Sequence, residues 1–188
     1  MNFDNDIEEC LQVLRDGGVI LYPTDTVWGL GCDATNPVAV EKIYRIKQRT
    51  DEKALIVLVA DENDILRHVA APDLALFDHL QKSIKPTTVI YPGALGFADN
   101  LIAKDGSIAI RICGDKFCKH LIKRFQRPIV STSANISGEI TPGNFKEINL
   151  QIINAVDYVV RYRQDDLSKA EPSSLIKWQN GKIEIIRY

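Results

Sequence analysis

Hydroxyl and carboxylate side chains follow a buried apolar run near the start of the chain. Residues 19–22 predict a strand, and Pro23 ends it because proline has no backbone N–H for a sheet. Thr24, Asp25 and Thr26 come next, at the kind of strand end where ligands bind in sheets with helical crossovers. Since threonine and aspartate are also common turn residues, an ordinary strand-turn-strand remains the alternative.

Three cations, Lys47, Arg49 and Lys53, gather at the end of an expected helix. In a binding site, Arg49 would clamp a carboxylate or phosphate with two hydrogen bonds, and Lys47 would supply a point charge. The alternative is that these cations only complement the negative end of the helix dipole.

Hydroxyl and amide groups gather again at residues 131–138, S-T-S-A-N-I-S-G, directly after a short strand expected at 128–130. Such a segment offers short donors to phosphate oxygens without a P-loop, although it is also compatible with a hydrophilic turn. Arg111 lies on the polar face of an alternating strand at 107–112, where it is a surface charge, a structural ion pair or a third anion ligand. Three clusters of anion-type donors beside strand ends indicate a ligand with several negative charges, and a nucleotide fits.

Several catalytic motifs are absent from the sequence. It contains no G-x-S-x-G, no P-loop, no G-x-G-x-x-G after the first strand and no H-E-x-x-H, and no histidine stands near a nucleophile. An enzyme built from these residues therefore works by positioning and electrostatics rather than by covalent or histidine-based catalysis.

Composition bounds the class of protein. The 188 residues are 45% hydrophobic and 26% charged, which predicts one globular domain, residues 1–188, rather than disorder. The net charge of −2 argues against strong nucleic-acid binding, so any RNA contact needs a local basic patch.

Cysteine spacing and the N-terminus predict the compartment. The four cysteines include no C-x-x-C and the three histidines no metal-spaced pair, so free buried thiols in a reducing cytoplasm are expected. The acidic N-terminus does not resemble a signal peptide, and the longest apolar run, 54–60, is too short to span a bilayer. A soluble cytoplasmic protein without membrane contact is predicted.

Hydrophobic periodicity predicts helices and strands that alternate irregularly along the chain. Helices are expected near residues 7–14, 37–47, 61–70, 72–80 and 117–125. Strands are expected at 19–22, 54–60, 87–91, 107–112, 128–130, within 152–160, at 174–177 and at 182–187. Gly29 and Gly31 let the backbone turn or approach a ligand closely, and residues 92–100 are expected to form a loop. The pattern indicates a mixed α/β single domain rather than a simple doubly wound sheet.

Six segments of the chain resemble a known family. Y-P-T-D-T-V-W-G-L-G at 22–31, I-K-Q-R at 46–49 and S-T-S-A-N-I-S-G at 131–138 resemble the YrdC-like threonylcarbamoyl-AMP synthases. Further family motifs are matched, in the same order, by residues 108–111, 172–174 and 185–187. The resemblance extends from about Ile7 to Arg187 and implies a twisted mixed sheet around a deep, positively lined cavity.

The resemblance also implies an activity. L-threonine, bicarbonate and ATP would give threonylcarbamoyl-AMP and pyrophosphate, with Mg²⁺ accompanying ATP and no residue expected to ligate a metal. Partner proteins would then transfer the threonylcarbamoyl group to the adenosine beside the anticodon of certain tRNAs. Part of the family is also described as binding double-stranded RNA.

Site residues follow from the motifs, position by position. Threonine would be bound by Thr24, Thr26, Lys53, Arg111 and Ser174, with Tyr22 and Asp25 shaping the wall. Lys47 and Arg49 match the family's K-x-R and would act in catalysis at the ATP phosphates and the carboxylate end of the substrate. The nucleotide would also be bound by Thr88, Ser131, Ser133, Asn135 and Arg187.

The chain departs from the family pattern at several points. Trp28 replaces a common tyrosine, residues 85–88 only partly match P-G-P-L-T, and K-A-L at 53–55 lacks a frequent proline. The sequence ends at Tyr188, so the extra C-terminal domain of longer members is not expected. Two other functions remain open: a double-stranded RNA-binding or ribosome-assembly module, and a paralogous nucleotide-dependent enzyme with another substrate.

Overall fold

The computed structural model describes residues 3–49, 55–179 and 182–187. The strands are β1 Ile20–Tyr22, β2 Gly29–Gly31, β3 Ile56–Val59, β4 Thr87–Tyr91, β5 Ile108–Ile112, β6 Ile129–Ser133, β7 Tyr158–Val159, β8 Ser174–Gln179 and β9 Lys182–Arg187. The helices are α1 Asp4–Arg15, α2 Pro37–Ile46, α3 Glu62–His68, α4 Ala75–Lys82, α5 Lys116–Phe125 and α6 Leu150–Ala155, with short 3₁₀ turns η1 Asp99–Leu101 and η2 Phe145–Glu147.

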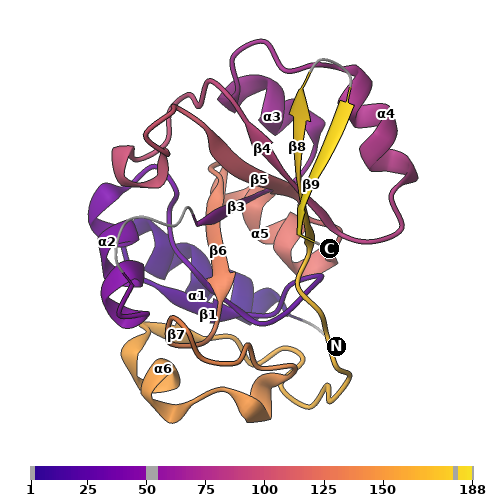
Figure 1. The fold of residues 1–188 in the computed structure, drawn as a ribbon. Helices are drawn as coiled ribbons and strands as arrows, with labels where there is room; N and C mark the ends of the chain where they lie inside the picture. The colour runs from indigo at the N-terminus through magenta and orange to yellow at the C-terminus, as the bar shows by residue number, and fades with distance from the viewer. Residues whose placement is uncertain (1–2, 50–54, 180–181, 188) are drawn as a thin grey trace.

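The described strands form one mixed sheet in the order β7-β1-β2-β6-β3-β5-β4-β8-β9. β1 with β7, β3 with β5, and β4 with β8 are parallel neighbours, and the other neighbours are antiparallel. Figure 1 shows β6 running across the direction of β4 and β5, so the sheet is strongly twisted. This confirms the predicted mixed α/β fold.

Helices α1 and α5 pack together beside the sheet. α1 buries an apolar stripe of Ile7, Cys10, Leu11 and Leu14, whose three- and four-residue spacing predicted the helix. Asp115 caps the start of α5, because its side chain accepts a hydrogen bond from the backbone N–H of Cys118 at 3.0 Å. Among the described residues, no helix combines the length and the hydrophobicity needed to cross a membrane.

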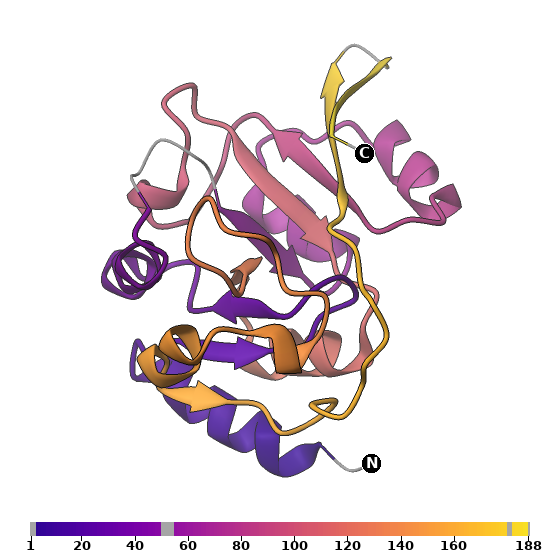
Figure 2. The ribbon, with the colours of Figure 1, turned by 60° about the horizontal axis from the view of Figure 1, so that its bottom comes forward.

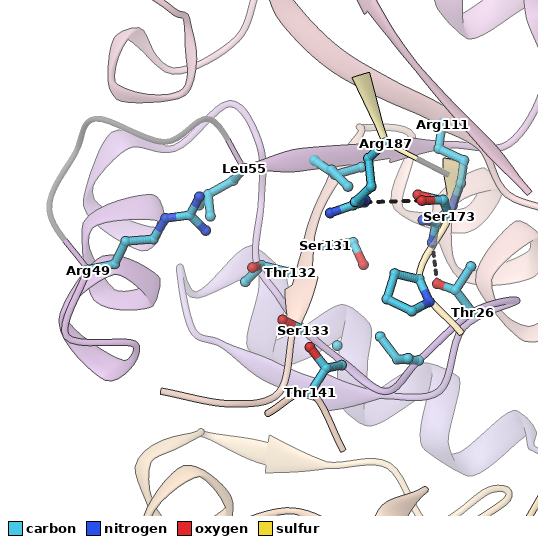
Figure 3. Close-up of a pocket in the computed structure, with 14 residues that line it drawn as sticks. Thr26, Arg49, Leu55, Arg111, Ser131, Thr132, Ser133, Thr141, Ser173 and Arg187 are labelled. Atoms are coloured by element: carbon cyan, nitrogen blue, oxygen red, sulfur yellow. Dashed lines mark hydrogen bonds between the residues drawn. The ribbon is translucent and has the colours of Figure 1, made fainter. Parts of the chain in front are cut away.

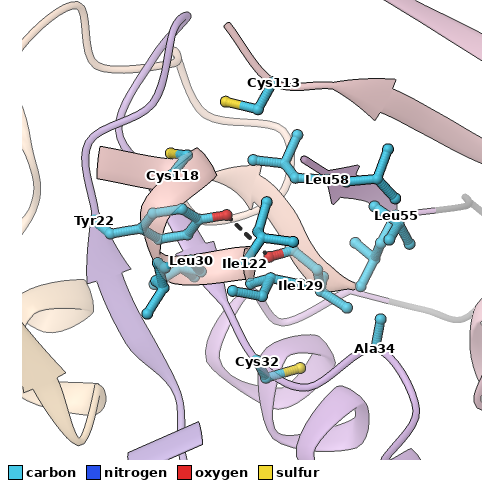
Figure 4. Packing of buried hydrophobic residues seen from close by; sticks show 14 of the residues in the cluster. Tyr22, Leu30, Cys32, Ala34, Leu55, Leu58, Cys113, Cys118, Ile122 and Ile129 are labelled. Atoms are coloured by element: carbon cyan, nitrogen blue, oxygen red, sulfur yellow. Dashed lines mark hydrogen bonds between the residues drawn. The ribbon is translucent and has the colours of Figure 1, made fainter. Parts of the chain in front are cut away.

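Tyr22 is a fully buried member of the hydrophobic core (Figure 4). Its hydroxyl donates to the carbonyl of Val130 at 3.2 Å, and burial raises the pKa of this phenol well above its usual value. The four cysteines, Cys10, Cys32, Cys113 and Cys118, are buried and free, which confirms the prediction made from their spacing.

Strand β6 is longer than the sequence predicted. The expected end at residue 130 is wrong, because β6 continues to Ser133. Backbone pairing of Leu30 with Thr132 and of Gly29 with Ser133 continues the ladder, and these partners are distant in sequence. The hydroxyl-rich segment therefore begins inside the sheet rather than beyond it.

A long connection of residues 160–173, between β7 and β8, crosses the molecule without regular secondary structure (Figure 2). Asp6 fixes its first residues, because its carboxylate accepts hydrogen bonds from the backbone N–H groups of Arg161 at 3.1 Å and Tyr162 at 2.9 Å. Arg163 then donates to the carbonyl of Thr24 at 3.2 Å. The connection is thereby tied to the turn that follows β1.

Gly31 allows the close backbone approach that the sequence suggested. A Cβ at this position would lie 2.5 Å from Cε1 of Tyr22 and 3.0 Å from the carbonyl oxygen of Val130. Tyr22 is fully packed and Val130 is backbone, so neither neighbour moves aside easily.

We expect Gly31→Ala to lower the free energy of unfolding by about 1–3 kcal/mol, the usual effect of overpacking a core. Urea denaturation of the variant and the wild type measures this change. Gly114→Ala is the matched control, because its Cβ would lie 3.5 Å from Oδ2 and 3.9 Å from Cβ of Asp25, which are ordinary contacts. Equal midpoints for Gly31→Ala and the wild type would contradict the close packing.

Candidate active site

A pocket of about 180 Å³ lies between the strands of the twisted sheet and the start of β8 (Figure 3). Three arginines line it, Arg49, Arg111 and Arg187. Its hydroxyl groups come from Thr26, Ser131, Thr132, Ser133, Thr141 and Ser173. Within the described part of the chain, the lining contains no aspartate or glutamate. Three cations and many hydroxyls in a lining without a described carboxylate make a site for an anionic ligand.

Arg111 on β5 is a buried cation, with only 4% of its surface exposed. Its Nη2 lies 3.1 Å from Oδ1 of Asp25 and donates to Oγ1 of Thr26 at 3.1 Å. The backbone N–H of Gly114 holds the other Asp25 oxygen at 2.8 Å. Nε of Arg111 is buried without a hydrogen-bond partner among the described atoms, and the Arg111 side chain also lines the pocket.

The turn after β1 holds Thr24 and Thr26 at different depths. Oγ1 of Thr24 donates to the carbonyl of Val27 at 2.8 Å and lies 3.0 Å from Oγ1 of Thr26. Thr26 lines the pocket, whereas Thr24 stands behind it with 2% of its surface exposed. Of the two threonine residues predicted to bind the substrate, the structure therefore brings only Thr26 to the pocket.

The C-terminal end of α2 places the side chains of Lys47 and Arg49 in different surroundings. Gln48 adopts a left-handed conformation, with φ of 50°. The N–H of Arg49 bonds to the carbonyl of Tyr44 at 2.9 Å, and the N–H of Gln48 to that of Arg45 at 3.0 Å. This is a Schellman motif, which reverses the chain at the end of α2. Arg49 consequently reaches the pocket.

Lys47 is placed behind the pocket wall, with 2% of its surface exposed. Its ammonium group donates to the carbonyls of Ser133 at 2.6 Å and Asn135 at 2.7 Å, and its own carbonyl accepts from the N–H of Ser137 at 2.9 Å. Burial, with the charge of Arg49 as a second cause, lowers the pKa of Lys47 to about 8. In this structure Lys47 holds the 133–137 segment rather than lining the pocket.

Of the predicted nucleotide-binding residues in S-T-S-A-N, some line the pocket and one does not. Ser131 and Ser133 line the pocket. Nδ2 of Asn135 donates to the carbonyls of Ile136 at 3.0 Å and Glu139 at 2.9 Å. The Asn135 side chain thus closes its own loop and is not part of the lining.

Two distant segments complete the pocket wall. Nη2 of Arg187, on β9, donates to the carbonyl of Ser173 at 3.1 Å. Oγ1 of Thr88 lies 2.8 Å from Oγ of Ser173, so Thr88 reaches the pocket only through that serine. The predicted Ser174 is buried next to Ser173 at the start of β8 but does not line the pocket. Lys53, also predicted, lies outside the described residues.

Sequence reasoning missed some of the lining. Ser173 was overlooked although the P-S-S motif contained it. Successive side chains of an extended chain point to opposite faces, so the motif indicated that either Ser173 or Ser174, but not both, would face the pocket. Thr141 and Pro172 carried no such signal, because their place in the wall depends on how distant segments pack.

The twisted mixed sheet and its arginine-lined pocket define an α/β protein built to bind anions. A model of the Sua5/YciO/YrdC family, described as telomere recombination, matches residues 12–188, and the chain belongs to this family. Threonylcarbamoyl-AMP synthase of Pseudoalteromonas translucida is 33% identical over 187 residues, covering 97% of this chain and 98% of that protein. The threonylcarbamoyl-AMP synthase of Idiomarina loihiensis is 32% identical over 169 residues, covering 88% and 90%.

Solved structures share the fold. E. coli YciO superposes with a TM-score of 0.83 at 23% identity, over 97% of this chain and 88% of that one. P. abyssi Sua5 complexed with L-threonine gives a TM-score of 0.85 at 21% identity, over 98% of this chain and 54% of that one. These similarities confirm the predicted YrdC-like architecture.

Replacing Lys47 by methionine tests whether its charge is buried. An unfolded lysine titrates near pH 10.4, whereas the pKa of folded Lys47 is about 8. Between these values the unfolded chain binds more protons at this position, so the free energy of unfolding rises with pH. Relative to Lys47→Met, wild-type stability should therefore increase by about 1 kcal/mol per pH unit from about pH 8 to about pH 10. Urea denaturation across this range measures the difference, and a pH-independent difference would contradict the burial of the charge.

Proposed function

We propose that this protein is an L-threonylcarbamoyladenylate synthase, which forms threonylcarbamoyl-AMP and pyrophosphate from L-threonine, bicarbonate and ATP. The observation that carries the proposal is a pocket with three arginines and no described carboxylate, in a chain that matches synthases of that name over nearly its whole length.

The reaction brings anions together. The amine of threonine and bicarbonate give a carbamate and water, and a carbamate oxygen then attacks the α-phosphorus of ATP while pyrophosphate leaves. Both reactants in the second step are negatively charged, so the barrier depends on charge neutralisation, which fixed cations in a partly enclosed site supply. No protein nucleophile is needed, in agreement with the absence of nucleophile motifs from the sequence.

The position of each group in the pocket supports a division of roles. Arg111, fixed beside Thr26, would bind the carboxylate of threonine. Arg49 and Arg187, together with the hydroxyls of Ser131 and Ser133, would bind the nucleotide. Lys47 would act by holding the 133–137 segment in its binding shape.

Magnesium would enter as part of the nucleotide substrate. Among the described residues, no group of three or more histidine, cysteine, aspartate or glutamate side chains is arranged to hold a metal ion. Mg²⁺ commonly binds through phosphate oxygens and water, with few protein ligands, which fits this donor set. Mg²⁺ bound to ATP would offset part of the triphosphate charge.

The product would pass to protein partners that modify tRNA, and this chain itself would work in the cytoplasm. Contact with tRNA or double-stranded RNA would have to rest on a local patch, because the net charge is −2. RNA binding with a steep salt dependence is the measurement for that part of the proposal.

The test of the proposed function is pyrophosphate release from MgATP in bicarbonate buffer, with and without L-threonine. Mass spectrometry of the same samples should detect threonylcarbamoyl-AMP only when all three substrates are present. Serine and other amino acids replace threonine in parallel reactions to test for a different substrate. ATP binding without threonine-dependent release, or turnover of another amine, would overturn the proposal.

Arg49→Ala should lower turnover by about 100-fold or more, the usual effect of removing a group that stabilises developing charge. Arg45→Ala is the matched control, because Arg45 is an exposed arginine near the end of α2 that forms an ion pair with Glu41 and does not line the pocket. Steady-state kinetics of both variants measures the difference. Equal turnover in the two would remove Arg49 from the site.

A further inference from the structure

The hydroxyl of Thr24 has only one proton, and the structure determines where it goes. Oγ1 of Thr24 lies 2.8 Å from the carbonyl oxygen of Val27. A carbonyl oxygen can only accept, so the hydroxyl of Thr24 must be the donor in this bond.

The direction of the next hydrogen bond follows. Oγ1 of Thr24 also lies 3.0 Å from Oγ1 of Thr26 and 3.0 Å from the backbone nitrogen of Thr26. Since the proton of Thr24 is already directed to Val27, both contacts must be accepted by Thr24, one from the N–H and one from the hydroxyl of Thr26. The hydroxyl proton of Thr26 therefore points to Thr24 and away from the pocket.

Thr26 is left with acceptor capacity only. Nη2 of Arg111 donates to Oγ1 of Thr26 at 3.1 Å, which uses one lone pair. The second lone pair belongs to an oxygen of a pocket-lining residue that is 8% exposed. Arg111 also lines the pocket, and a guanidinium can only donate hydrogen bonds. The pocket wall thus presents a fixed donor next to a fixed acceptor.

We propose that Thr26 accepts a hydrogen bond from the nitrogen of the bound amino acid, while Arg111 binds its carboxylate. Thr24 is the positioning residue that sets this polarity, although it touches no ligand. The proposal rests on the proposed synthase function and adds the orientation of the amino acid. An amino acid offers an N–H donor and a carboxylate acceptor a short distance apart, which complements the pair.

The direction of the hydrogen bond between Thr26 and the nitrogen affects the carboxylation step. The nitrogen lone pair of the neutral amine forms the new N–C bond to bicarbonate carbon. A C–O bond of bicarbonate breaks, and the departing hydroxide takes one N–H proton to leave as water. A hydroxyl that donated to the nitrogen would occupy the lone pair that must react. An acceptor instead holds an N–H and leaves the lone pair available, and the carbamate nitrogen still has one N–H for the same contact.

Calorimetric titration with two ligands tests the proposal without turnover. L-Threonine carries the nitrogen, whereas 3-hydroxybutanoate has the same carboxylate and hydroxyl but no nitrogen. The wild type should bind threonine at least about 10-fold more tightly than 3-hydroxybutanoate, because only threonine satisfies the acceptor. Thr24→Val frees the Thr26 proton, so the ratio should fall to about 3-fold or less with the affinity for 3-hydroxybutanoate unchanged.

Three further variants separate polarity from structural damage. Thr26→Val removes the acceptor itself and should also abolish the preference for threonine, which keeps the test valid if Thr24→Val does not fold. Thr24→Ser keeps the hydroxyl and should retain the preference. Thr35→Val is the matched control, because its hydroxyl donates to Asp33 at 2.7 Å and lies outside the pocket.

The outcomes are distinguishable. An equal loss of affinity for both ligands in Thr24→Val and Thr26→Val would show a purely structural role and overturn the proposal. An unchanged preference in both variants would also overturn it, while leaving the synthase function standing. If the wild type binds ATP but neither ligand, the proposed function and this orientation fail together.

Discussion

The buried guanidinium of Arg111 is the charge on which the polar half of this molecule depends. A cation that is 4% exposed is costly unless it is paired, and the turn after β1 supplies both Asp25 and Thr26. The Asp25 carboxylate in turn accepts a hydrogen bond from the backbone N–H of Gly114, two residues before α5. One ion pair therefore fixes β5, the β1–β2 turn and the start of α5 relative to each other, and these segments form one end of the pocket.

The other end of the pocket depends on different roles of the two cations in K-x-R, Lys47 and Arg49. Lys47, at the end of α2, points inward, where backbone carbonyls bind its ammonium group. The Schellman motif at Gln48 then reverses the chain and brings Arg49 to the pocket. A compact ammonium suits a cluster of carbonyls, whereas a planar guanidinium suits two oxygens of an anion. The two cations consequently serve different purposes, because Lys47 shapes the site and Arg49 lines the pocket.

Much of this arrangement was predictable from local sequence. The alternation of residues along 107–112 predicted β5 and placed Arg111 on the strand face that the pocket occupies. The motifs indicated Arg49 and Ser131 as parts of one anion site. The burial of Lys47 and the direction of the hydrogen bond from Thr26 to Thr24 were not predictable. Both depend on carbonyl groups whose positions exist only after the chain has folded, and side-chain type alone does not report them.

The central claim is that an amino acid lies at the Arg111 end of this pocket with a nucleotide beside it. The most direct measurement is a crystal structure with L-threonine and a non-hydrolysable ATP analogue. The account predicts the threonine carboxylate on the guanidinium of Arg111, its nitrogen within hydrogen-bond distance of Oγ1 of Thr26, and phosphate oxygens near Arg49. Threonine bound elsewhere, or with its nitrogen directed away from Thr26, would contradict the account.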